Sequence, residues 1–228
     1  MLYSRRSIAG TSQLNVRLDR PAENSKYKNL PVLVRSMGLP AQEIFPSLML
    51  SPDEKEKAKR QLRVAVMRRD PTDPVVGIFV GGRKSIGKRW PKENFMELIT
   101  RLHTQDIHVV VFVGPDEKDV VRYFGQTLPR DVPLVFEPST RIFAALVSNC
   151  ALFIACDSGP MHLALALAVR TIGIVVKEFN SDRWMPPATL ARVVYQTEGH
   201  SITELIDACY VELENLSVKG ERRRVENT

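Results

Sequence analysis

The sequence predicts an α/β fold in which a mostly parallel, Rossmann-like sheet carries helices on both faces. The first observation is a series of short, continuous apolar runs such as Val75 to Val80 and His108 to Val113, which are typical of strands buried on both faces. The second is that segments of helical length separate these runs, so that strand and helix alternate. This alternation implies right-handed crossovers between parallel strands.

The elements follow in a regular order. The capping box Ser51-Pro-Asp-Glu54 predicts a helix from Pro52 to about Arg69, which the segment Asp70 to Pro74 ends. The strands expected after it are residues 75–80, 108–113, 132–136, 151–155 and 171–176. The helices expected beside them are residues 91–104, 116–127, 141–149, 160–169 and 202–213.

The 228 residues are enough for one large domain or one and a half ordinary ones. Residues 1–50 show short polar pieces without a sustained period, and we expect them to be the remnant of a preceding domain. Residues 51–74 are expected to form a connecting helix and linker, residues 75–216 the Rossmann-like domain, and residues 217–228 a charged tail.

The positive charge is concentrated in the first third of the chain. Residues 1–69 hold 14 lysines and arginines against six acidic residues, whereas the rest of the chain is slightly acidic. Aromatic residues do not alternate with these charges, which disfavours a nucleic-acid groove. An anionic membrane surface, a phosphate-rich partner and a simple solvated face all remain open.

The sequence also indicates the cellular compartment. No apolar run approaches the roughly 18 residues of a membrane span, and no apolar region follows the early arginines as it would in a secretion signal. The three cysteines form neither a CxxC pair nor an even disulfide framework. We therefore expect a cytoplasmic protein.

In parallel sheets of this kind, ligands bind beyond the carboxyl ends of the strands. The loop from Gly81 to Pro91 follows the first strand; Gly81 and Gly82 let the backbone approach a ligand, and Arg83, Lys84, Lys88 and Arg89 supply positive charge. This pattern favours a phosphate or diphosphate over a plain basic turn. Arg89 stands where a Walker loop needs Ser or Thr, and the dinucleotide GxGxxG pattern is missing.

A second loop, residues 156–162, lies between a buried strand and a helix. Ser158 is expected to cap that helix, Gly159 opens the backbone, Pro160 suits the first turn, and the amides up to Met161 could bind an anion or sugar oxygens. Asp157 is a candidate hydroxyl ligand. His162 could donate to a phosphate, or be a packed histidine.

A third loop holds Asp116 and Glu117 after Gly114-Pro115. A carboxylate there could bind ribose hydroxyls, or could simply place negative charge at a helix start. Neither the cysteines nor His103, His108 and His200 have the spacing of a metal site, so we expect no metal and no cofactor.

Taken together, these segments resemble glycosyltransferase family 9, the heptosyltransferases of the lipopolysaccharide core. The resemblance covers roughly residues 70–190. Its motifs, in order, are Lys88-Arg-Trp-Pro91, Val113-Gly-Pro-Asp-Glu117, Asp157-Ser-Gly-Pro-Met-His-Leu-Ala-Leu-Ala166 and Arg183-Trp-Met-Pro186.

The resemblance implies a GT-B transferase of two Rossmann-like domains, of which this chain would hold the donor-binding one and the end of the acceptor-binding one. Leu33 to Leu39 would be the last acceptor-domain helix. The donor would be a nucleotide sugar such as ADP-heptose, used by inverting displacement without a metal. The acceptor would be a lipopolysaccharide or related glycan, with a possible contact at the inner membrane surface.

The resemblance also implies residue roles. Lys88 would stabilise the leaving group with the amides of Ser158 to Met161, Gly81 and Gly82 would make room for the diphosphate, and Asp116 would bind ribose. Asp157 and His162 would orient the sugar or phosphate. The catalytic base would lie in the acceptor-binding half.

Two observations keep alternatives open. Lys177 to Ser181 replaces the family's Gly-Pro-Thr-x-Pro segment near the donor, which leaves the exact nucleotide sugar open. No Gly-rich first strand with a following Asp precedes residue 33. A non-catalytic nucleotide-sugar or phosphate-binding module is therefore the alternative function, whereas the missing dinucleotide glycines disfavour an epimerase or dehydrogenase.

Overall fold

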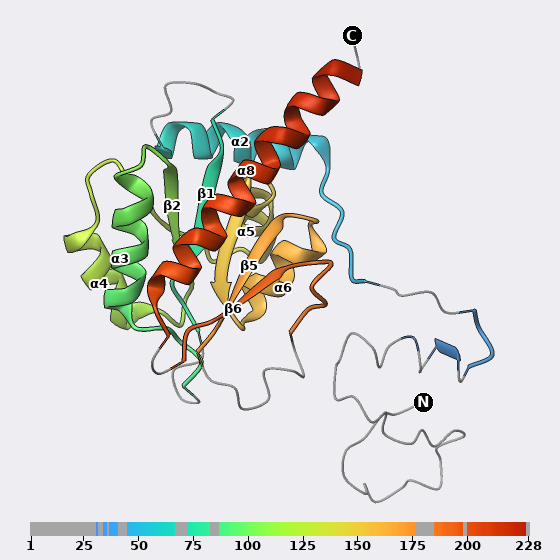
Figure 1. Cartoon of the computed structure of the whole chain (residues 1–228), viewed down its shortest axis with the longest axis horizontal. Coiled ribbons are helices and arrows are strands. Elements are labelled where there is room, and N and C mark those ends of the chain that lie inside the picture. Colours follow the sequence, from blue (N-terminus) through green and yellow to red (C-terminus); the bar gives the residue numbers. More distant parts are fainter. Residues whose placement is uncertain are drawn as a thin grey trace, which may run out of the picture.

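The computed structural model describes residues 31, 34–35, 37–40, 45–66, 73–82, 87–176, 185–197 and 200–226, and for residues 66 and 217–226 it describes the backbone alone. Within these ranges the chain forms one six-stranded sheet with helices on both faces (Figure 1). The strands are β1 Val75–Phe79, β2 His108–Val113, β3 Leu134–Phe136, β4 Leu152–Cys156, β5 Arg170–Val175 and β6 Arg192–Tyr195. The helices are α2 Pro52–Val66, α3 Lys92–His103, α4 Lys118–Thr127, α5 Thr140–Val147, α6 Gly159–Ala166 and α8 Ile202–Glu226.

The strand order is β3-β2-β1-β4-β5-β6, and every neighbouring pair is parallel. This is the order of a Rossmann sheet, in which the chain first builds outward from β1 and then returns to add β4 on the other side. The order reverses between β1 and β4, where Phe79 lies beside Ala155. Loops after these two strands diverge, which leaves a crevice at the carboxyl edge of the sheet.

Alternate side chains of the strands form two cores, one on each face of the sheet. On one face Ile78, Val111 and Ile154 pack with residues of α3, α4 and α8. On the other face Phe112 and Phe153 pack with residues of α2, α5 and α6. Helix α8 crosses in front of the sheet in Figure 1. Both sheet faces are covered, as the apolar runs in the sequence predict.

Helix α2 begins at the predicted capping box. The Ser51 amide donates to Glu54 Oε2 at 2.7 Å, and the Glu54 amide donates to Ser51 Oγ at 3.2 Å. Arg141 of α5 donates to the same Glu54 carboxylate and, at 3.2 Å, to the Met49 carbonyl. These bonds attach α2 to the sheet through α5.

The structure differs from the sequence prediction in two elements. The edge strand β6 lies in a region expected to be a loop, because its four residues are too short a run to signal a strand without knowledge of the partner β5. Helix α8 continues to Glu226, well beyond the predicted end near residue 213. In the predicted Leu33 to Leu39 helix, Val34 and Arg35 are helical and a turn follows at Met37 and Gly38. Leu33 and Ser36, the Lys177 to Ser181 segment, and Arg183 and Trp184 lie outside the described residues. No described helix is both long and apolar enough to cross a bilayer.

Candidate functional site

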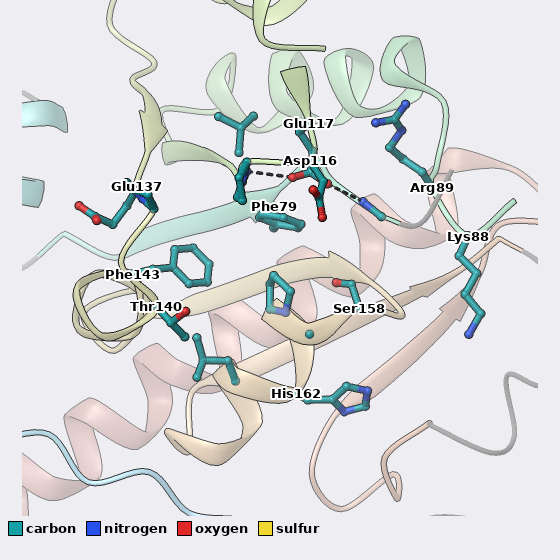
Figure 2. Close-up of a pocket in the computed structure, with 18 of the residues that line it drawn as sticks. Phe79, Lys88, Arg89, Asp116, Glu117, Glu137, Thr140, Phe143, Ser158 and His162 are labelled. Carbon is teal, nitrogen blue, oxygen red and sulfur yellow. Dashed lines mark hydrogen bonds between the residues drawn. The ribbon is translucent and has the colours of Figure 1, made fainter. Parts of the chain in front are cut away.

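A pocket of about 1180 Å³ opens at the carboxyl edge of the sheet (Figure 2). Its walls come from the loops after β1, β2, β3 and β4, so it occupies the crevice where the strand order reverses. The loops predicted from the sequence to bind a ligand therefore meet in one place.

Lys88, Asp157 and His162 form a charged cluster on the β1–β4 side of the pocket. The Lys88 ammonium pairs with Asp157 Oδ2, and His162 Nε2 lies 3.7 Å from Asp157 Oδ1. Asp157 is only 10% exposed, whereas His162 is 30% exposed and faces the cavity. One oxygen of the carboxylate thus pairs with Lys88, and the other faces the His162 ring.

The charge state of Asp157 follows from these contacts. Burial acts to raise its pKa, but the interactions with His162 and Lys88 outweigh burial and hold the pKa below its usual value. Asp157 is therefore ionised at neutral pH. An ammonium has three donors, so Lys88 keeps N–H groups for a second acceptor while it contacts Asp157.

A second carboxylate, Glu117, lies on the β2 side of the pocket and is buried. Its Oε1 accepts from the Gly82 amide at 3.3 Å and its Oε2 accepts from the Gly114 amide at 3.0 Å (Figure 2). The two amides come from the loops after β1 and β2, so Glu117 joins the ends of both strands. Each of its oxygens keeps a lone pair for a further donor.

Glycine is required around Glu117 because the carboxylate fills the space of a side chain. A Cβ at Gly81 would lie 2.4 Å from Glu117 Oε1, and one at Gly114 would lie 2.7 Å from Oε2. A Cβ at Gly82 would meet the Lys88 carbonyl at 2.9 Å. These glycines create the cradle for a buried carboxylate, a role that the sequence analysis did not assign to them.

Burial raises the pKa of Glu117, and the Gly82 and Gly114 amides and the charge of Arg89 act against that rise. Asp116, by contrast, is exposed at the pocket rim. Of the two acidic residues in this loop, Glu117 is the one that the backbone positions. The signal for it in the sequence is the Gly114-x-x-Glu117 spacing opposite Gly81-Gly82.

The start of α6 forms the pocket floor. Ser158 occupies the N-cap position, but its hydroxyl donates to the Cys156 carbonyl at 2.9 Å and does not cap the helix, so the expected side-chain cap is wrong. Gly159 and Pro160 line the cavity. The Met161 side chain is fully buried on the core side, where a Cβ at Gly173 would lie 2.9 Å from its sulfur.

An apolar wall and a few polar groups complete the pocket. Phe79, Val113 and Phe143 contribute the apolar surface on the side of β1, β2 and α5. Glu137 and Thr140 lie at its edge, after β3. Flat apolar surface beside a few fixed polar groups is typical of a site for a small organic ligand.

Most predicted site residues lie together. Gly82, Lys88, Asp116, Asp157, Ser158, Gly159, Pro160 and His162 line the pocket. Gly81 and the Met161 side chain support it from behind, and Arg83 and Lys84 lie outside the described residues. Phe79, Phe143, Glu137 and the Arg89–Asp119 pair were not predicted, because their positions depend on contacts between distant segments.

Two observations on the described residues concern metal ligands and thiols. No three His, Cys, Asp or Glu side chains group there as metal ligands would. Burial raises the pKa of Cys150, Cys156 and Cys209 to about 12, so all three thiols stay protonated at neutral pH.

The fold and the pocket define a Rossmann-like domain with a ligand crevice at the reversal of its strand order. The sequence profile of glycosyltransferase family 9 (heptosyltransferase) matches residues 3–206. The chain belongs to this family.

Curated relatives agree with this assignment. The chain is 28% identical over 130 residues to lipooligosaccharide heptosyltransferase 2 of Haemophilus influenzae, covering 53% of this chain and 37% of the relative. It is 24% identical over 174 residues to lipopolysaccharide heptosyltransferase 2 of Escherichia coli, covering 74% of this chain and 48% of the relative. The chain thus spans less than half the length of these relatives.

Solved structures share the fold. A family 9 glycosyltransferase from Veillonella parvula superposes with a TM-score of 0.74 at 20% identity, over 88% of this chain and 63% of that one. The ADP-heptose LPS heptosyltransferase II of E. coli gives 0.63 at 22% identity, over 82% and 57%. The predicted fold class, a Rossmann-like α/β sheet of the GT-B type, is confirmed.

Proposed function

We propose that this chain binds a nucleoside-diphosphate sugar and presents it for inverting glycosyl transfer. ADP-heptose is the leading donor, and a lipopolysaccharide core or related glycan is the acceptor. The observation that carries the proposal is the pocket between β1 and β4, which brings Lys88, Asp157, His162 and Glu117 to one cavity. Each group suits one part of such a donor.

The diphosphate fits the β1–β4 side. Lys88 has spare donors beside Asp157, and the start of α6 adds the positive end of a helix dipole. His162 borders the same space and supplies a further donor. The proposal therefore assigns the negative charge of the leaving group to Lys88 and these neighbours, and it requires no metal.

The ribose fits the β2 side. Glu117 presents the free lone pairs of a fixed carboxylate, which suit two neighbouring hydroxyl groups. Asp116 at the rim can assist. The apolar wall of Phe79, Val113 and Phe143 then offers a surface for the base. Asp157, next to Lys88, would accept from sugar hydroxyls beside the diphosphate.

The proposed reaction is a single displacement. An acceptor hydroxyl oxygen attacks the anomeric carbon, the bond from that carbon to the diphosphate oxygen breaks, and the nucleoside diphosphate leaves with the electron pair. The acceptor proton passes to a base, which the family resemblance assigns to the acceptor-binding domain. Lys88 would stabilise charge that increases at the leaving oxygen, and such preorganised stabilisation is a large part of catalysis.

The names of the relatives support the sugar and the acceptor. Those from H. influenzae and E. coli are heptosyltransferases of lipooligosaccharide and lipopolysaccharide, and the solved E. coli structure is that of an ADP-heptose LPS heptosyltransferase. A lipid-linked acceptor would bring the protein to a membrane surface. The basic excess of residues 1–69 suits an anionic one.

Calorimetric titration tests donor binding. Purified protein is titrated with ADP-heptose, ADP, and UDP- and GDP-sugars, and we expect ADP-heptose to bind most tightly. If none of the nucleotides binds, the donor-site assignment is wrong. If a UDP- or GDP-sugar binds most tightly, the pocket is still a nucleotide-sugar site, but the assignment of adenine as the base is wrong.

The second candidate is a nucleotide-sugar-binding module without transfer activity of its own. It is favoured by the pocket itself, because Lys88, Asp157, His162 and Glu117 are all assigned above to the donor and none to the acceptor. A radiolabelled transfer assay with deacylated lipopolysaccharide core separates the candidates. Multiple turnovers would exclude the binding module, whereas tight donor binding without transfer would support it.

A further inference from the structure

Two adjacent cationic residues after β1 point in opposite directions. Figure 2 shows the Lys88 and Arg89 side chains extending away from each other. Lys88 contacts Asp157 at the end of β4, and Arg89 contacts Asp119 in the first turn of α4, after β2. The loop that enters α3 is therefore attached to both sides of the point where the strand order reverses. The mechanism proposed above uses Lys88 and gives no role to Arg89.

The Arg89–Asp119 ion pair is bidentate. Arg89 Nη1 donates to Asp119 Oδ1 at 2.9 Å, and Nη2 donates to Oδ2. The Arg89 side chain is only 9% exposed, although Asp119 is 44% exposed. A planar guanidinium bound through two parallel hydrogen bonds fixes direction as well as distance, which a lysine cannot do.

The backbone at Lys88 and Arg89 also touches the Glu117 cradle. A Cβ at Gly82 would lie 2.9 Å from the Lys88 carbonyl and 3.0 Å from Arg89 Cα, so Gly82 is packed directly against these residues. The Gly82 amide in turn donates to Glu117. A shift of the 88–89 backbone would therefore disturb both Lys88 and the Glu117 contact.

Among the described residues, Trp90 is a further anchor of this segment. Trp90 is buried and packs edge to face on Phe95 at 5.0 Å between ring centroids, which anchors the chain where it enters α3. That anchor lies after Arg89. Asp157 holds the end of the Lys88 side chain, but a four-carbon stem leaves the backbone direction open.

We propose that Arg89 is a positioning residue, which through Asp119 holds the 88–89 backbone in the place that lets Lys88 reach a bound diphosphate. The proposal rests on the proposed function, because Lys88 is assigned there to the diphosphate. In this proposal Arg89 and Asp119 touch no reacting atom, but they set the position of Lys88, which contacts the diphosphate.

Binding measurements with adenosine and ADP isolate the effect on the diphosphate. Arg89→Lys keeps the positive charge but removes the planar guanidinium with its two parallel N–H donors. Asp119→Asn keeps the size of the side chain but removes its negative charge. We expect each change to lower the ratio of the adenosine Kd to the ADP Kd about fivefold to tenfold, with adenosine binding itself changed less. Arg101→Lys, in the exposed Arg101–Glu97 pair on α3, is the matched control and should change neither value.

A double-mutant cycle distinguishes positioning from direct contact. In a Lys88→Ala background, Arg89→Lys should weaken ADP binding little further, because the residue that it positions is gone. Additive losses in the double variant would mean that Arg89 contacts the phosphate itself, and would overturn the proposal. An unchanged ratio in Arg89→Lys and Asp119→Asn would overturn it too.

Hydrogen exchange in the ligand-free protein supplies a readout that does not depend on nucleotide binding. Asp119→Asn should speed amide exchange across residues 87–90 several-fold, and Arg101→Lys should not. If wild type bound no nucleotide, the proposed function would fall, and the exchange rates would still decide whether Arg89 holds this segment. Unchanged exchange in Asp119→Asn would show that it does not.

Discussion

Two ion pairs in this molecule look alike and serve different regions. Lys88 and Asp157 pair at the pocket, and Arg170 of β5 pairs with Glu212 of α8 on the far side of the sheet. The two carboxylate side chains are buried to the same extent: Asp157 is 10% exposed and Glu212 is 9% exposed. The difference lies in the neighbours: Asp157 also contacts His162 and borders a cavity, whereas Arg170 and Glu212 do not line the pocket.

The comparison shows that burial of a charge does not reveal its role. A pair beside a cavity can share its cation with a ligand, so its removal should be seen in binding. A pair between a strand and a helix that does not line the pocket has no pocket ligand to bind, so its removal should be seen in stability. Four changes test this distinction.

The largest effect is expected from Lys88→Ala. Loss of a charged hydrogen bond to a diphosphate should cost about 1.5–3 kcal/mol of binding, or roughly tenfold to a hundredfold in the ADP Kd. Lys84→Ala, in the same basic loop but outside the matched Lys-x-Trp-Pro segment, is the control and should have a much smaller effect. Equal losses from the two lysines would mean that the loop is only a diffuse basic surface.

Glu212→Gln should act on stability instead. It leaves Arg170 without its charged partner at the β5–α8 contact, and because Arg170 is 39% exposed we expect only about 1–2 kcal/mol. That corresponds to a Tm lower by about 2–6 °C in a thermal melt. ADP affinity should not change; a loss of affinity without a loss of Tm would reverse the assignment of the two pairs.

Asp157→Asn tests whether the carboxylate at the pocket acts in ligand binding rather than in stability. The amide keeps the shape but loses the charge that Lys88 and His162 contact, so we expect ADP-heptose affinity to fall about fivefold to tenfold. The Tm should change by less than in Glu212→Gln. A larger drop in Tm than in that variant would show that Asp157 is mainly structural.

The smallest effect is expected at a third ion pair, Glu54 with Arg141, which lies in solvent. Hydrogen bonds from Arg141 and the Ser51 amide lower the pKa of Glu54 from 4.5 to about 2. A depressed folded-state pKa contributes stability above the unfolded value and loses it as pH falls through the folded value. The Tm difference between wild type and Glu54→Gln should therefore be constant above about pH 5 and vanish towards pH 2; a difference that persists at pH 2 would contradict this origin.

The sequence is sufficient to predict the sheet because its signals are local. Short continuous apolar runs such as His108 to Val113 favour strands buried on both faces, and the Ser51–Glu54 capping box is visible within four residues. Strand β6 escapes prediction because its four residues become a strand only through pairing with β5.

The site follows the same rule. Lys88 and Asp157 are predictable because they belong to matched motifs on the loops after β1 and β4. The sequence places Glu117 beside Asp116 as a possible ribose ligand, but the Gly82 amide that positions Glu117 lies 35 residues away in sequence. The Arg89–Asp119 pair depends likewise on a fold contact between two loops. Ser158 lies at the expected N-cap position, but its hydroxyl donates to the Cys156 carbonyl and does not cap the helix.

The attachment of α2 has a practical consequence for anyone who trims this protein. Ala58 and Leu62 are both 2% exposed and belong to the same core as Phe112 and Phe153. The Leu48 amide donates to the Ala166 carbonyl at 2.7 Å, and Asn149 donates to the Lys55 carbonyl at 3.1 Å. An expression fragment that starts at Val75 would expose the part of this core that α2 covers and would favour aggregation, whereas a start before Phe45 keeps it covered. The useful cloning boundary therefore lies about 30 residues upstream of the first strand.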